Sequence, residues 1–402
     1  MNIDLVRKVD QGVGTPLCFL LSLLERALRM FRPPLAQSLA PKKILFLKFS
    51  ELGAIVLAYP LMARVKRMCP GADLYFVTFE RNRELLKLMN GLVPAKNVFL
   101  VREDPLGFVW DFLAAIFRLR GQGIDVIFDL EFFSRVSAIF SYCVHAPKRI
   151  GFHRYTLEGL YRGDLLTHQV LYNPTAHITK NYLAMESEVG APQKKEPQVS
   201  QTIDPKDLIF PEYASQETVR QSVLEKLRGF GIDSGKKKIF LMNAGEGMLP
   251  LREWPIENFV ALAKRILENK EHALVIVGTC SAEKKSTQLA SAVADPRCVN
   301  LIGQTTLEEL LELFTMSHRL ISNDCGLAHL AMLTPVRTVT IFGPESPRIF
   351  GSLSESARVA YADWPCSPCL SALNHRDSAC RFNHCLHAIK VEDVFRVVCA
   401  NP

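Results

Sequence analysis

The sequence lacks an apolar run long enough to cross a membrane as a helix. Its N-terminal apolar segment, 13–24, has about half the length that a bilayer requires, and Glu25, Arg26 and Arg29 interrupt its continuation. No small-residue cleavage site follows it, so we do not expect a secretory signal. Strong charge is also lacking, because the net charge is +7 for 402 residues and the basic residues are spread along the chain. This composition argues against membrane-spanning, exported and nucleic-acid-binding proteins.

A disulfide framework is not indicated either. The chain has 11 cysteines, an odd number, and no export signal, which favours a reducing compartment. Hydrophobic residues make up 48% of the chain and charged residues 22%, enough apolar material for two ordinary cores. We therefore expect a cytoplasmic protein of two domains.

Residues 1–40 differ in pattern from the rest of the chain. Apolar residues recur at helical spacing, and arginines between them could contact lipid headgroups, as in an interfacial helix on the inner face of the cytoplasmic membrane. The alternative is a helix packed on the body of the protein. The apolar set is Leu17, Leu20, Leu21, Leu24, Leu28 and Phe31, and the basic set is Arg26, Arg29 and Arg32.

Two series of alternating strands and helices follow, which predicts an α/β fold with two Rossmann-like domains facing a central cleft. The proline-rich, polar segment 191–210 separates them, so we place the domains at 41–205 and 206–402. The strands that we predict are 43–49, 73–79, 97–101, 124–130 and 149–152 in the first domain, and 238–243, 272–278, 299–303, 319–322 and 336–342 in the second.

The clearest functional pattern lies at 319–351. A short apolar strand breaks at Asn323-Asp324, and Cys325-Gly326 stand where a helix would begin. Helix N-termini at the carboxyl edge of a parallel sheet bind anions, and a neighbouring carboxylate suits sugar hydroxyls. The alternative is that Asn323-Asp324 only cap the helix.

A second pattern follows the strand 238–243. Gly245 and Gly247 lie in a turn that would let the backbone approach a ligand closely, and Arg252 precedes Trp254-Pro255 at the head of a helix. A guanidinium matches phosphate oxygens in a bidentate way, so we predict that Arg252 contacts a diphosphate. Proline at a helix start and a buried tryptophan would explain the other two residues by structure alone.

The stretch 319–351 resembles the C-terminal signature of glycosyltransferase family 9, the ADP-heptose:lipopolysaccharide heptosyltransferase family. That signature reads S-x-D-T/S-G-x-x-H-L-A-A, followed by a segment ending F-G-P-T. Cys325 departs from the usual threonine or serine. The matching residues are Ser322, Asp324, Gly326, His329, Leu330, Ala331, Thr340, Phe342, Gly343 and Pro344.

The first loop also resembles this family, whose pattern is K-x-S-x-L-G-D-x-V-x-x-x-P. Lys48, Ser50 and Gly53 match and imply an acceptor loop, but Ala54 replaces the aspartate that is the family's proposed general base. Alanine cannot accept a proton. Three possibilities stay open: another carboxylate acts as the base, transfer proceeds without one, or the chain is a catalytically silent relative. The substitute bases are Glu131, slightly favoured, then Glu51 and Asp129.

The resemblance implies the GT-B fold and an inverting transfer of a heptose-like sugar from a nucleotide-diphospho-sugar, with no metal or other cofactor required. The acceptor would be a lipopolysaccharide-core or lipid-linked envelope saccharide. A scaffold or saccharide-binding protein is the main alternative, and an epimerase a weaker one. The implied donor-binding residues are Arg252, Gly245, Gly247, Glu283, Thr305, Asp324, Cys325, Gly326 and His329.

Four cysteines near the C-terminus form a separate pattern, C-x2-C-x10-C-x4-C. Four thiolates can hold zinc, and the first pair has the usual spacing. A zinc ion here would be structural, and packed free thiols are the alternative. The residues are Cys366, Cys369, Cys380 and Cys385.

Overall fold

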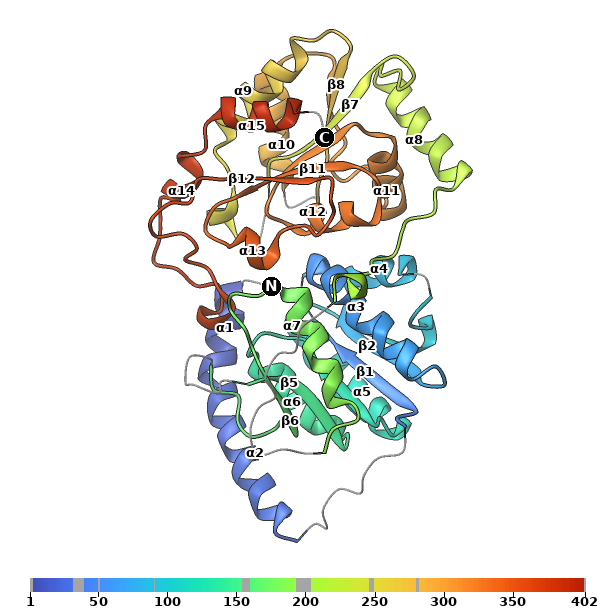
Figure 1. Ribbon diagram of the computed structural model, residues 1–402, viewed down its shortest axis with the longest axis vertical. Helices are drawn as coiled ribbons and strands as arrows, with labels where there is room; N and C mark the ends of the chain where they lie inside the picture. The colour runs from blue at the N-terminus through green and yellow to red at the C-terminus, as the bar shows by residue number, and fades with distance from the viewer. Residues whose placement is uncertain are drawn as a thin grey trace. The chain divides into compact units, whose positions relative to one another are not determined.

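The computed structural model describes residues 3–31, 40–49, 51–89, 91–153, 160–192, 204–245, 249–279 and 282–400. The chain forms two compact units (Figure 1). The N-terminal unit comprises Met1–Ile209 and Ala372–Arg376, and the C-terminal unit comprises Phe210–Ser371 and Asp377–Pro402. A short segment from late in the sequence thus belongs to the first unit. Among the described helices, none has the length and apolar character needed to cross a membrane.

The N-terminal unit contains a six-stranded parallel sheet in the order β3-β2-β1-β4-β5-β6. Its central strands are apolar and buried, as expected for a parallel sheet that is covered on both faces. The order reverses between β1 and β4, where ligands bind in folds of this type. The strands are β1 (Lys43–Leu47), β2 (Asp73–Phe79), β3 (Val98–Val101), β4 (Val126–Asp129), β5 (Lys148–His153) and β6 (His168–Leu171).

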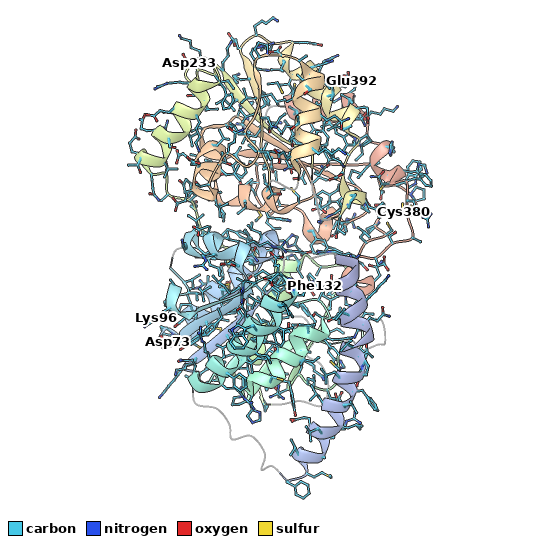
Figure 2. All side chains as sticks on the ribbon, turned by 180° about the vertical axis from the view of Figure 1, so that it is seen from behind. Asp73, Lys96, Phe132, Asp233, Cys380 and Glu392 are labelled. Carbon is cyan, nitrogen blue, oxygen red and sulfur yellow. The ribbon has the colours of Figure 1, made fainter. Side chains whose placement is uncertain are left out.

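Helices cover both faces of this sheet, because right-handed crossovers on either side of β1 place their helices on opposite faces. One face carries α3 (Leu52–Met68), α4 (Arg83–Leu88) and α7 (Ile178–Ala184). The other carries α5 (Pro105–Gln122), α6 (Arg135–Val144) and α2 (Gly14–Arg29), and α1 (Ile3–Gly12) directly precedes α2. Figure 2 shows this second face toward the viewer.

The C-terminal unit repeats the same sheet order, as β12-β11-β10-β7-β8-β9, so its reversal lies between β7 and β10. Its core packs α9, α10 and α15 on the sheet around Trp254. The strands are β7 (Lys238–Asn243), β8 (His272–Ile276), β9 (Cys298–Asn300), β10 (Arg319–Asn323), β11 (Arg337–Phe342) and β12 (Ala357–Tyr361). The helices are α8 (Glu217–Gly229), α9 (Ile256–Leu267), α10 (Glu283–Val293), α11 (Leu307–Met316), α12 (Gly326–Leu330), α13 (Pro347–Phe350), α14 (His384–His387) and α15 (Val391–Cys399).

The predicted α/β fold with two Rossmann-like domains is confirmed, and the ten predicted strands all appear within a few residues of their expected bounds. Two strands were missed, β6 and β12. Both lie at the edge of a sheet and are only partly buried, so their sequences lack the long apolar run that marked the central strands.

Candidate functional site

In the C-terminal unit, two residues predicted to bind a donor meet where β7 and β10 end. Asp324 follows β10 and is buried, and its backbone N–H donates to the carbonyl of Ile341 at 3.1 Å. The Arg252 guanidinium Nη1 lies 3.5 Å from Asp324 Oδ2 and 3.9 Å from Glu345 Oε1. One cation therefore lies between two buried carboxylates at the reversal of the sheet.

Burial raises the pKa of Asp324, and the nearby Arg252 opposes that shift. The Arg252 side chain is 11% exposed. Its guanidinium can therefore still offer donors to a phosphate group, in the planar geometry that phosphate oxygens match. Removing the cation would take away the positive charge that offsets the cost of burying Asp324.

Asn323 holds this arrangement together. Its amide Nδ2 donates to the Ala244 carbonyl at 3.1 Å, and its Oδ1 accepts the Trp254 backbone N–H at 2.9 Å. The Trp254 indole donates to the Ile389 carbonyl at 3.0 Å and stacks edge-on against Phe259. Asn323 therefore joins the ends of β7 and β10 to the segment that carries Arg252. The sequence marked Asn323 only as the end of a strand or a helix cap and did not reveal this positioning contact.

The remaining predicted donor residues that the structure describes follow four strands of this sheet, β7, β8, β9 and β10. A Cβ atom at Gly245 would lie 2.5 Å from the Ala282 Cβ, so only glycine fits without a shift. Cys325 is the residue before α12, and its sulfur lies 3.1 Å from the Ser322 hydroxyl. Gly326 and His329 belong to α12, and His329 is buried. Glu283 is exposed at the start of α10, and Thr305 is half-buried before α11. Gly247 lies outside the described residues.

In the N-terminal unit, the ends of β1 and β4 bring Lys48 and Glu131 together. The Lys48 ammonium donates to Glu131 Oε2 at 2.7 Å, and the Phe49 backbone N–H donates to Glu131 Oε1 at 2.7 Å. Lys48 is almost fully buried, and its Nζ lies 5.2 Å from the centroid of the Phe132 ring. Each carboxylate oxygen of Glu131 thus accepts a hydrogen bond from the first loop.

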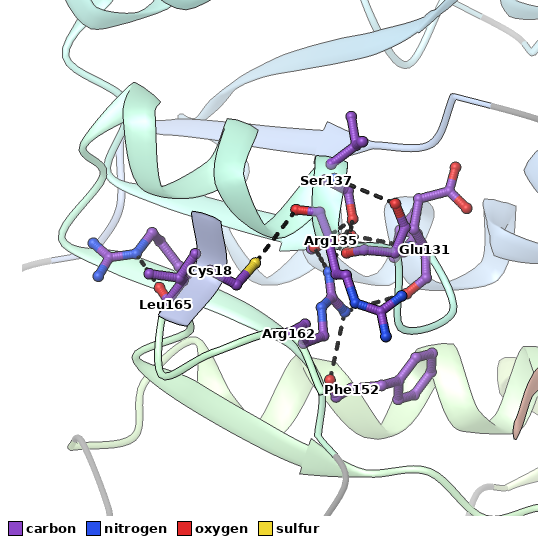
Figure 3. A network of polar contacts seen from close by, with 12 residues as sticks. Cys18, Glu131, Arg135, Ser137, Phe152, Arg162 and Leu165 are labelled. Carbon is purple, nitrogen blue, oxygen red and sulfur yellow. Dashed lines mark hydrogen bonds and ion pairs between the residues drawn. The ribbon is translucent and has the colours of Figure 1, made fainter. Parts of the chain in front are cut away.

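Asp129 is fully buried, and its partners Ser137, Arg162 and Glu131 are labelled in the polar network of Figure 3. It forms an ion pair with Arg162 and accepts the Ser137 hydroxyl at 3.0 Å and the Glu131 backbone N–H at 3.1 Å. Burial raises the pKa of Asp129, and Arg162 opposes the shift. The side chain is fully buried, so its contacts support the loop that carries Glu131 rather than reaching outward.

Glu51 is the residue before α3, with a φ of +66° that few residues other than glycine adopt. It pairs with Arg376, which comes from the segment Ala372–Arg376. The Arg376 guanidinium lies 5.9 Å from the Phe132 ring centroid, and Arg7 donates to the Arg376 carbonyl at 2.9 Å. Burial and the nearby Arg7 lower the pKa of Arg376 to about 10.

Sequence reasoning missed Arg376, because no local motif marks it and its partner lies at the other end of the chain. Ala54 is buried in the first turn of α3, and Gly53 precedes it. Ser50 lies outside the described residues. A half-buried cation, Arg376, therefore lies beside the first loop, and the motif of that loop does not mark it.

The cysteine pattern has no support as a zinc site. Among the described residues, which include Cys366, Cys369, Cys380 and Cys385, no three His, Cys, Asp or Glu side chains are grouped so that they could hold a metal ion. The four cysteines are thiols that form no disulfide bond, and burial raises the pKa of Cys385 to about 11, with the neighbouring thiols adding to the shift.

Two Rossmann-like units of identical strand order place the chain in the GT-B class of α/β proteins. The sequence model of glycosyltransferase family 9 (heptosyltransferase) matches residues 113–379. The chain belongs to this family.

Individual relatives agree with this assignment. Lipopolysaccharide heptosyltransferase 2 of Salmonella typhimurium is 30% identical over 113 residues, 27% of this chain and 32% of that protein. The lipopolysaccharide core heptosyltransferase OpsX of Haemophilus influenzae is 19% identical over 310 residues, 77% of this chain and 81% of that protein. The match with the first of these spans about a third of the relative's length.

A solved structure of E. coli ADP-heptose lps heptosyltransferase II resembles the fold, with a TM-score of 0.68 and 20% identity over 89% of this chain and 97% of that one. At this level of identity the likeness concerns the fold alone.

Proposed function

We propose that this chain is an inverting, metal-independent glycosyltransferase. It moves a heptose-like sugar from a nucleotide-diphospho-sugar, of the ADP-heptose type, to a lipopolysaccharide-core or lipid-linked envelope saccharide. Family membership and the names of the relatives support the reaction class. The observation that carries the proposal is the meeting of Arg252 with Asp324 at the reversal of the C-terminal sheet.

The donor's diphosphate would contact Arg252, and Asp324 would orient sugar hydroxyls. As the bond to the sugar breaks, negative charge grows on the diphosphate, and a preorganised guanidinium stabilises that charge. Backbone N–H groups at Cys325 and Gly326 would add to this stabilisation. In this scheme the side chains and backbone supply the positive charge that a divalent cation supplies elsewhere.

Two carboxylates remain as the proton acceptor for the attacking hydroxyl. Glu131 follows β4 and is held by Lys48 and Phe49, and Glu51 lies in the loop after β1 and is held by Arg376. A base must come within about 3 Å of the hydroxyl, directly or through one water. Glu51 has a side chain that is 26% exposed, whereas Asp129 is fully enclosed and better suited to support.

A catalytically silent, saccharide-binding relative is the second candidate, because Ala54 stands where the family has its base. The two functions differ in one observable. The silent protein would bind the nucleotide-sugar and release no nucleotide, either with an acceptor present or without one.

We also propose that α2 contacts the inner face of the cytoplasmic membrane. The side of this helix that packs on the protein carries Cys18, Leu21, Ser22 and Glu25. Ser22 accepts the Asp164 backbone N–H at 2.8 Å, and Glu25 is buried 3.8 Å from Arg149. Most of the large apolar residues of α2 are exposed on its other side. The exposed set is Leu17, Phe19, Leu20, Leu23 and Leu24.

The test is a panel of nucleotide-sugars in a thermal unfolding assay, with EDTA present throughout. A donor stabilises only the folded protein, by about 2.7 kcal/mol when its concentration is about 100 times Kd. We expect an ADP-sugar to raise Tm and, with a lipopolysaccharide-core acceptor, to release ADP. No shift with any nucleotide-sugar would refute the transferase and the silent binding protein together.

A further inference from the structure

Helix α5 presents a row of large apolar side chains to the outside of the N-terminal unit. Leu106, Trp110 and Phe117 are 86%, 72% and 69% exposed, and Val109 and Leu113 between them are also exposed. These positions are spaced by three, four and seven residues, so they lie on one side of the helix. The row covers about three turns.

The opposite side of α5 is apolar as well. Phe108 and Phe112 pack against Phe49, and Ile116 and Leu119 are buried in the same core. A surface helix of a soluble protein normally carries polar residues on its outer side, and one that is apolar all round is normally covered. The outer row is therefore not needed to attach α5 to its own sheet.

Neighbouring helices extend this apolar surface. α5 contacts α6, α6 contacts α2, and all three lie on the same face of the sheet (Figure 2). Half-buried Ile139 and Tyr142 on α6 pack against Leu21 of α2. The outer sides of these three helices, α5, α6 and α2, form what we call the helical face.

The charged side chains on and around α5 leave an excess of positive charge. Its carboxylates are engaged: Asp111 pairs with Arg102 at 2.8 Å, and Asp104 accepts the Gly107 N–H at 2.8 Å as the helix cap. Arg118 and Arg120 are exposed in the last turn. Arg120 comes three residues after Phe117, so it lies on the same side of the helix as the apolar row.

We propose that the helical face docks on an anionic lipid bilayer, with α5 as a second anchor beside α2. Trp110 and Phe117 enter the boundary between headgroups and acyl chains, and Arg118 and Arg120 contact lipid phosphates. A large apolar surface edged by arginine has the composition of an interfacial helix. This deepens the membrane association proposed above, and it holds or fails independently of sugar transfer.

The first test is co-sedimentation of the full-length protein with vesicles of phosphatidylcholine alone or mixed with phosphatidylglycerol. We expect binding to the mixed vesicles and a loss of about tenfold or more in the Trp110→Ser, Phe117→Ser double variant. The matched control is Phe382→Ser, which removes a similarly exposed aromatic side chain, 68% exposed, from the C-terminal unit. The Arg118→Ala, Arg120→Ala variant should bind the mixed vesicles more weakly. Its binding should also depend less on the phosphatidylglycerol content of the vesicles.

Tryptophan emission gives a second readout that does not depend on a destabilising variant. The chain has three tryptophans, and Trp254 is fully buried, so Trp364→Phe leaves Trp110 as the exposed reporter. We expect its emission to shift to shorter wavelength on mixed vesicles and to be quenched by brominated lipid. Unchanged emission, or a double variant that binds like Phe382→Ser, would overturn the proposal.

Two further measurements detect self-association and misfolding. If a second copy of the chain covers the helical face, sedimentation velocity would show a dimer that the double variant loses while vesicle binding is retained, which would also overturn the proposal. Transfer to a deacylated, soluble acceptor should be unchanged in the double variant. If the double variant lost this transfer activity to the same extent as vesicle binding, the variant would be misfolded, and an anchoring role for these side chains would be refuted.

Discussion

Replacing Arg252 with lysine tests how the C-terminal site handles a diphosphate. The substitution Arg252→Lys keeps a positive charge between Asp324 and Glu345, which lie 3.5 and 3.9 Å from the guanidinium, so the fold should survive. Alanine would instead remove the cation that pairs with buried Asp324, and breaking a buried pair in this way typically destabilises by about 3–5 kcal/mol. Lysine therefore separates the chemistry from the folding.

The lysine ammonium is a point charge and cannot offer two parallel N–H donors to a phosphate. Loss of one preorganised donor to a developing negative charge typically lowers the rate about 100-fold, or about 2.7 kcal/mol in the transition state. We expect kcat/KM for ADP release to fall by that factor, with a Tm close to that of the unchanged protein.

The matched control is Arg297→Lys, which alters an arginine of the same unit that pairs with Asp295 at 2.7 Å instead of the strand ends. It should leave kcat/KM within about twofold. If Arg252→Lys were as active as Arg297→Lys, the guanidinium would not bind the diphosphate, and the proposed donor site would be wrong.

Three other predictions follow from the structure. Glu131→Gln and Glu51→Gln each keep the shape of the side chain, and the substitution at the residue that is the base should lower kcat by about 10²–10⁴-fold with little change in the donor-induced rise in Tm. If both variants were as active as the unchanged protein, neither Glu131 nor Glu51 would be the base. Gly245→Ala places a Cβ 2.5 Å from that of Ala282, so we expect a loss of about 1–3 kcal/mol in the free energy of unfolding, measured by chemical denaturation. Donor binding, measured by calorimetry, should also weaken. Unchanged values of both would contradict the packing. Burial lowers the pKa of His375 to about 4, whereas the same side chain in the unfolded protein takes up a proton below about pH 6.5. The free energy of unfolding should therefore fall by up to about 3 kcal/mol as the pH drops from 6.5 to 4. His375→Gln should flatten that part of the profile of stability against pH.

The sequence carried much of the information about strand ends. Residues that follow parallel strands converge on one edge of a sheet, so the neighbourhood of Asp324 and Arg252, and of Lys48 and Glu131, followed from a correct assignment of strands. The edge strands β6 and β12 were missed, because partial burial removes the apolar run on which that assignment depends.

Contacts between distant segments could not be predicted in the same way. Arg376 meets Glu51 because the chain returns late to the N-terminal unit, and no local pattern records that return. The periodicity of α2 predicted an apolar side without saying where it faces. Burial of Glu25 beside Arg149 turns that side outward, and a buried ion pair of this kind depends on tertiary structure.

The most direct test of the central claim is transfer from radiolabelled ADP-heptose to a lipopolysaccharide-core acceptor in excess EDTA, comparing the unchanged protein with Arg252→Lys. We expect labelled acceptor and stoichiometric ADP without added metal, and about 100-fold slower transfer by the variant. Transfer that stops in EDTA and returns with a divalent cation would contradict it.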